Sequence, residues 1–209
     1  MMESGQLVLT VGHSTHAIES FVDLLRQHRI TAIADVRSSP YSRFNPQFNR
    51  ESLEQSLKAI GIRYVFLGRE LGARSDDPSC YENGQVQYAR LARTALFQSG
   101  IERVLKGAAD LRIALMCAEK DPLDCHRTLL VARALADRGA TIEHVLADGL
   151  IEPHAMTMER LFDVTGMPRE DLFRTHDELL LEAIAKQESR IAYIDQKLAD
   201  NAGNGEASE

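Results

Sequence analysis

The stretch RIALMCAEKDPLDCHRTLLVARALADRGATIEHVL, residues 112–146, decides the fold of this chain. It begins with a short apolar run, Arg112–Cys117, and ends with a second one, Thr141–Leu146. Between them lie a polar loop and a helical pattern over Cys125–Arg138. Two apolar runs of strand length joined by a helical segment are typical of a β-α-β unit with parallel strands. The stretch therefore predicts a parallel sheet covered by helices.

The same alternation of strand and helix patterns extends toward the N-terminus. Apolar runs rich in β-branched residues predict three more strands, at Leu7–Val11, Ile30–Val36 and Ile62–Leu67. Amphipathic spacing predicts helices over Ile18–Leu25 and Leu53–Ile60, and a longer one over Val86–Leu105. We therefore expect an α/β fold with three layers, α/β/α, built on a mostly parallel sheet of about five strands.

The pattern changes after Asp148. Helices are expected over Met156–Phe162 and Asp171–Leu198, with no further strand. The predicted division is an α/β domain at 1–150, a C-terminal helical extension at 151–200 packed on it, and a disordered tail at 201–209. The apolar stripe of the long helix would pack on the domain or on a second copy, so a homodimer through this helix is one expectation.

Composition limits the class of protein. The chain has 209 residues, enough for one good core, and its 44% hydrophobic and 26% charged residues are ordinary for a globular protein. No apolar run approaches the roughly 20 residues that a membrane helix needs, and the N-terminus has no signal-peptide pattern. An odd cysteine count, three, indicates reduced thiols rather than a disulfide framework. A cytoplasmic location without membrane contact is expected.

Charge is unevenly distributed along the chain. The formal net charge is −7, which argues against general coating of nucleic acid. Residues 26–74 nevertheless carry nine Lys/Arg against four Asp/Glu, while the remainder carries fifteen against twenty-seven. This basic segment favours a small anionic ligand as the partner, although arginines on solvated helix faces would give the same count.

Polar and reactive side chains follow the predicted strands. In an open parallel sheet, ligands bind beyond the carboxyl ends of the strands. Because every predicted strand ends in such residues, we expect them to converge on one pocket. The candidates at these ends are His13, Ser14, Asp35, Arg37, Cys117 and Glu119.

The loop from Cys117 to Arg127 carries the sharpest motif, CAEKDPLDCHR. Asp124 is the expected N-cap of a helix that begins at Cys125. The free N–H groups of the first turn, together with Arg127, would bind a phosphate or carboxylate. A thiolate close to them would have a lowered pKa.

Three interpretations of this loop stay open. In the first, Cys117 or Cys125 is a nucleophile, with His13 or His126 as the base or acid. In the second, Cys117, Cys125 and His126 bind zinc or iron, although adjacent Cys-His ligands would strain a single centre. In the third, both cysteines are simply buried.

A second motif surrounds Asp35 and Arg37, which lie two apart on a strand and point to the same face. They form a buried ion pair, or Asp35 orients a histidine or substrate while Arg37 binds an anion. The loop Tyr41–Arg50 then interleaves aromatics with arginines, a mixture that suits stacking on a base and contact with phosphate. Its Arg43 is a candidate ligand contact, and we expect the loop to cover the pocket.

Taken together, these motifs resemble the DUF488 family, a domain family without an assigned function. The matching pieces are VGHS at 11–14, DVRSSP at 35–40, SRFNPQF at 42–48, LG at 71–72 followed by Arg74, LMCAE at 115–119 and CHR at 125–127. They span about residues 7 to 150. The resemblance implies the α/β fold and the place of the site, and it names no reaction.

The function expected from these residues is an enzyme with a Cys/His/Arg site that acts on a small anionic, phosphate- or nucleotide-like substrate. The expected catalytic residues are His13, Asp35, Cys117, Glu119 and His126, and the expected substrate-binding residues are Ser14, Arg37, Arg43, Cys125 and Arg127. No metal is favoured, and zinc or iron at Cys117, Cys125 and His126 is the alternative. The second class of function is a non-catalytic module that binds nucleic acid or a regulatory ligand.

Overall fold

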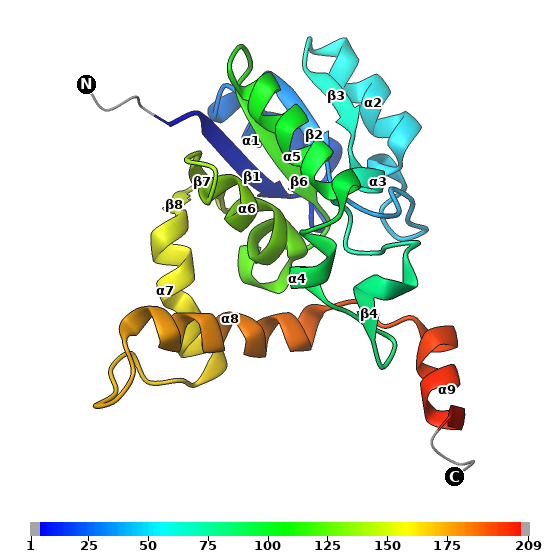
Figure 1. Cartoon of the computed structure of the whole chain (residues 1–209). Helices are drawn as coiled ribbons and strands as arrows, with labels where there is room; N and C mark the ends of the chain where they lie inside the picture. Colours follow the sequence, from blue (N-terminus) through cyan, green and yellow to red (C-terminus); the bar gives the residue numbers. More distant parts are fainter. Residues whose placement is uncertain (1–4, 206–209) are drawn as a thin grey trace.

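A computed structural model describes residues 5–205 of the chain (Figure 1). Its main sheet has six strands in the order β3-β2-β6-β1-β7-β8. All neighbours pair in parallel except β7 and β8, which are antiparallel. The predicted α/β fold with a mostly parallel sheet is therefore confirmed. The strands are β1 (Leu7–Gly12), β2 (Ala32–Asp35), β3 (Arg63–Phe66), β6 (Ile113–Cys117), β7 (Thr141–Val145) and β8 (Ile151–Pro153).

Two hydrophobic cores cover the two faces of the sheet. Side chains alternate along β1, so that Val8 enters one core while Leu9 and Val11 enter the other. The core that contains Leu9 is closed by α1 (Ile18–Gln27) and α2 (Arg50–Ala59). The opposite core is closed by α5 (Ala95–Ala108), the π-helical turn η4 (Arg127–Ala132), α6 (Arg133–Ala136) and the C-terminal helices.

The segment between β3 and α5 is more broken than the sequence pattern indicated. It contains α3 (Gly68–Leu71), η2 (Pro78–Cys80), a small antiparallel hairpin of β4 (Tyr81–Glu82) and β5 (Gln85–Val86), and α4 (Tyr88–Leu91). The single helix predicted over Val86–Leu105 is therefore wrong. Thr94 separates α4 from α5 because its side chain accepts a hydrogen bond from the Phe97 N–H and so caps a new helix.

The region after Asp148 also departs from expectation. The prediction of no further strand is wrong, because Gly149, at φ +85°, turns the chain and β8 returns along β7. The single helix expected over Asp171–Leu198 is also wrong. After α7 (His154–Thr165), a capping box of Thr175 and Glu178 starts α8 (His176–Ile191), and α9 (Gln196–Gly205) follows. The expected tail at 201–209 overlaps α9 as far as 205, and 206–209 lie outside the described residues.

Helix α8 packs on the α/β domain (Figure 1). Its Leu179 and Ala183 are fully buried, and Gln187 donates a hydrogen bond to the Leu123 carbonyl at 3.1 Å. Arg133 and Glu188 add an ion pair at 2.9 Å. The apolar stripe of this helix is thus used within the chain, and the homodimer stays a prediction.

None of the helices in the described part of the chain combines the length and the apolar character that a membrane crossing requires.

Candidate active site

A cavity of about 300 Å³ lies at the carboxyl edge of the sheet. It is enclosed by the segments that follow β2, α3 and β6, and by the residues that follow α8. Strand pairing brings the ends of β2 and β6 together, since Asp35 lies opposite Met116 in the β2–β6 ladder. The lining residues used below are Arg37, Ser38, Arg74, Tyr88, Cys117, Glu119, Cys125, His126 and Tyr193.

The loop after β6 is held close to the end of β1. Gly12 permits this approach, because a Cβ at that position would lie 1.9 Å from the Glu119 carbonyl oxygen. Beyond the turn, Asp121 accepts a hydrogen bond from the Leu123 N–H and caps a short 3-10 helix, η3 (Pro122–Asp124). Cys125 is extended, with φ −140° and ψ 138°.

The helix predicted to begin at Cys125 therefore begins later, at Arg127, and Asp124 does not cap it. The reason is Pro122, whose fixed φ suits the first turn of the short helix that Asp121 starts. The Asp124 carboxylate instead accepts a hydrogen bond from Gln187 of α8, at 3.3 Å. The predicted anion site in a first helical turn capped by Asp124 loses its basis.

Two cysteines and one histidine meet at the floor of the cavity. Nδ1 of His126 lies 3.8 Å from Cys117 Sγ and 3.9 Å from Cys125 Sγ. The other ring nitrogen, Nε2, lies 2.9 Å from the carbonyl oxygen of Val36. A carbonyl only accepts, so Nε2 carries the proton. In the neutral ring, the lone pair of Nδ1 consequently faces both sulfurs.

The thiol of Cys125 donates a hydrogen bond to Oε2 of Glu119, with 3.0 Å between the two atoms. Burial raises the pKa of the Glu119 carboxyl, and the charge of Cys125 raises it further. Burial also raises the pKa of Cys117. For Cys125, burial is outweighed by the hydrogen bond from Cys117 and the charge of Arg127, so its pKa lies below the usual range. Of the two thiols, Cys125 is therefore the one whose pKa is shifted toward the thiolate form.

Arg37 is held rigidly beside this cluster. Its Nε and NH2 donate to the two carboxylate oxygens of Asp35, at 2.9 and 2.6 Å, and NH2 also donates to the Phe48 carbonyl. NH1 donates to His13 Nε2 at 3.1 Å. A guanidinium has five N–H groups, and these contacts use four. Arg37 also lines the cavity, and among the described residues its remaining NH1 hydrogen has no acceptor.

His13 positions Arg37. Its Nε2 accepts from Arg37, and its Nδ1 donates to the Ser14 carbonyl at 2.9 Å. Burial, followed by the charge of Arg37, lowers the pKa of His13 to about 4. The ring is also stacked on Phe48, with 4.2 Å between centroids. Both ring nitrogens are engaged, so the imidazole that faces the thiols is that of His126.

Two other residues predicted to contact the ligand, Arg127 and Arg43, do not line this cavity. Arg127 is fully buried and donates to the Glu119 and Lys120 carbonyls, at 2.7 and 3.3 Å, so it holds the loop. Arg43 is exposed in the loop before α2. That loop does lie at the carboxyl edge, because its Phe48 contacts both His13 and Arg37.

Three residues of the cavity wall were not among the candidates from sequence. Arg74 stacks over the Tyr193 ring, 4.4 Å from its centroid, and its backbone N–H donates to Ser38 Oγ. Tyr88, from α4, is buried. Arg74 stands in a motif shared with the family and could have been proposed, whereas nothing in the sequence connects Tyr193 with the thiols.

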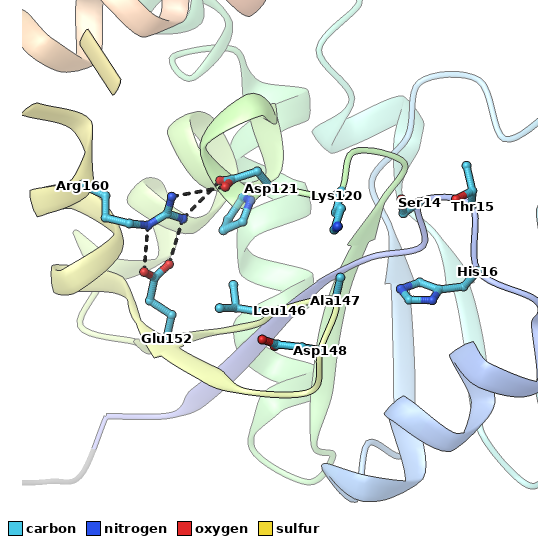
Figure 2. A pocket seen from close by; sticks show the side chains of 11 residues that line it. Ser14, Thr15, His16, Lys120, Asp121, Leu146, Ala147, Asp148, Glu152 and Arg160 are labelled. Atoms are coloured by element: carbon cyan, nitrogen blue, oxygen red, sulfur yellow. Dashed lines mark hydrogen bonds and ion pairs between the residues drawn. The ribbon is translucent and has the colours of Figure 1, made fainter. Parts of the chain in front are cut away.

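A larger and more open cleft lies on the other side of the β6 loop (Figure 2). Ser14, a predicted substrate contact, lines it together with His16 and Lys120. Its arginine, Arg160, is bound by Glu152 and Asp121, as the dashed lines of Figure 2 show. No thiol is among the residues that line this cleft, and Arg160 is already paired, so the smaller cavity is the better candidate site.

Comparisons with known proteins give one match. No curated protein and no solved structure matched the chain. A family model described as "Domain of unknown function DUF488" matches residues 17–134, which is more than half of the chain. The match contains both Asp35-Arg37 and the loop with Cys117, Cys125 and His126. The chain belongs to the DUF488 family.

Proposed function

We propose that this chain is an enzyme that transforms a small anionic substrate in the cavity above Cys117, Cys125 and His126. The observation that carries the proposal is the placement of a buried cluster of two thiols and an imidazole in the same cavity as a fixed guanidinium. The thiol cluster supplies a nucleophilic centre. The free N–H of Arg37, with the guanidinium of Arg74 at the rim, supplies an anion contact.

The size and burial of the cavity support a small substrate. A volume of about 300 Å³ is at the lower end of the range for ligand pockets. Cys117 and Cys125 are almost completely buried, with 2% and 1% of their surface exposed. A reagent therefore reaches them only by entering the cavity, past Arg37 and Arg74.

Charge selectivity of thiol alkylation tests this proposal. The protein is treated with chelator and reductant and then reacted with iodoacetate, which is anionic, or iodoacetamide, which is neutral. One charge-assisted contact is worth about 1.5–3 kcal/mol, or roughly a ten-fold rate preference or more. We expect the iodoacetate-to-iodoacetamide rate ratio at Cys125 to exceed that of the denatured chain by at least about ten-fold, and inorganic phosphate to slow the reaction.

Matched arginine variants test which side chain causes the preference for iodoacetate over iodoacetamide. Arg74→Gln should lower the ratio toward that of the denatured chain. Arg63→Gln should leave it unchanged, because Arg63 is exposed at the start of β3, at the opposite edge of the sheet. A native protein with the same ratio as the denatured chain, and no protection by phosphate, would reject the anionic substrate.

A further inference from the structure

The geometry points to a divalent transition-metal ion, zinc before others, held by Cys117 Sγ, Cys125 Sγ and His126 Nδ1. This inference deepens the proposed function and rests on it, since the ion would belong to the same cavity. In the described part of the chain these are the three side chains that come together in this way, with all ligand atoms within 4.8 Å of one another and all three residues buried.

The distances agree with one tetrahedral ion. Zinc binds sulfur at about 2.3 Å and nitrogen at about 2.0–2.1 Å, which places S and N ligands about 3.6 Å apart at a tetrahedral angle. The two S–N distances, 3.8 and 3.9 Å, require a contraction of only a few tenths of an ångström. Cys125 and His126 are neighbours in sequence, and with an extended backbone at Cys125 the two ligand atoms already lie 3.9 Å apart.

The orientation of His126 is a second, independent observation. A histidine that binds a metal through one ring nitrogen usually donates from the other to a carbonyl or carboxylate, which fixes the ring and its tautomer. The Nε2–H of His126 donates to the Val36 carbonyl in this manner, and the Nδ1 lone pair faces the sulfurs. The ring is therefore oriented for coordination before any ion binds.

The chemistry of the three ligand atoms, two sulfurs and one nitrogen, indicates which metal ion would bind. Two thiolates and an imidazole favour zinc over magnesium or calcium, which prefer oxygen ligands. Three protein ligands leave a fourth position for water, substrate or a carboxylate, as in catalytic zinc sites. Glu119 is the nearest carboxylate, with Oε2 3.0 Å from Cys125 Sγ, and the cavity lies beside it. Arg37 lines the same cavity as the three ligands.

Metal content and affinity test the site. Protein purified without chelator is expected to contain one zinc per chain by elemental analysis. Cobalt added to the full chain after chelator treatment should give a thiolate-to-cobalt charge-transfer band. Cys117→Ser and Cys125→Ser should each weaken zinc affinity by more than about 100-fold, because loss of an outer-shell partner already costs 10–100-fold.

Cys80→Ser is the matched control, since Cys80 is a buried free cysteine outside the cluster. It should keep the zinc and the cobalt band. Where a cluster variant fails to fold, the cobalt band of the unmodified chain decides. No band and no zinc in that chain, or equal loss of zinc in Cys80→Ser, would overturn the metal site.

The two proposals fail separately. If the chain binds no metal but iodoacetate selectivity and phosphate protection persist, only the metal is lost. If zinc binds and the anion preference is absent, the ion holds the loop and the proposed function falls.

Discussion

The substitution Asp35→Asn probes the buried ion pair that fixes Arg37. Asp35 is fully buried and Arg37 is 6% exposed. The Asp35 carboxylate accepts from the Arg37 backbone N–H and from its guanidinium, and also from the Tyr64 hydroxyl at 2.7 Å. An asparagine has nearly the same shape but only one acceptor oxygen and no charge. The substitution therefore leaves a buried cation without its counter-ion.

The expected cost is large. Breaking a buried ion pair by removing one partner costs about 3–5 kcal/mol. For a protein of this size, each kcal/mol lowers Tm by about 2–4 °C, so a decrease of at least about 6 °C is expected. Urea denaturation followed by circular dichroism measures the free energy of unfolding, and the slope with denaturant should not change.

The control is Asp163→Asn, which removes a carboxylate from an arginine pair of similar geometry. Asp163 and Arg169 lie 2.8 Å apart, but their side chains are 64% and 49% exposed. Because water replaces the lost partner, this variant should unfold with wild-type stability. If Asp35→Asn also unfolded within error of the wild type, the buried pair would not fix Arg37, and the geometry of the anion contact would lose its support.

Three further predictions concern the fold and the cavity. Gly12→Ala should lower the free energy of unfolding by about 1–3 kcal/mol in urea, because its Cβ would overlap the Glu119 carbonyl oxygen. Tyr193→Ala should increase the rate of Cys125 alkylation without unfolding the domain, because it opens one wall of the cavity. Burial lowers the pKa of His144 to about 2 and that of His154 to about 4, so the unfolded chain binds more protons below pH 6.5. Stability should be complete above pH 6.5 and fall toward pH 4, by about 3 kcal/mol for His154 alone; a flat profile over this range in urea titrations would contradict it.

The centre of the sheet could be predicted from sequence because β1, β2 and β6 are buried on both faces. Such strands read as continuous apolar runs, as in Ile113–Cys117, and their carboxyl ends are marked by the first polar residues. The missed strand, Ile151–Pro153, is short and lies at the edge, so two of its three residues are exposed and it carries no pattern. Helix boundaries were missed where one side chain decides them, as Thr94 does.

The site could be located from sequence, but the roles within it could not be assigned. Strand ends show that His13, Cys117 and His126 lie near one edge, because parallel strands share their polarity. Whether His13 or His126 faces the thiols depends on side-chain hydrogen bonds, and these cannot be read from the spacing of residues in the sequence. The acceptors that decide it are the carbonyls of Ser14 and Val36. Arg127 was similarly expected at a ligand, and the structure places it on backbone carbonyls.

One backbone segment couples the two halves of the site. The carbonyl of Val36 holds His126, and the next residue is Arg37. The imidazole and the guanidinium are therefore both anchored to this segment, His126 through the Val36 carbonyl and Arg37 through the contacts of its guanidinium with Asp35 and His13. The Val36 N–H in turn donates to the Met116 carbonyl at 3.1 Å, one residue before Cys117. Under the proposed function, a substrate bound at Arg37 would meet a Cys-His cluster held by the same backbone segment, and such fixed placement is the preorganisation that favours catalysis.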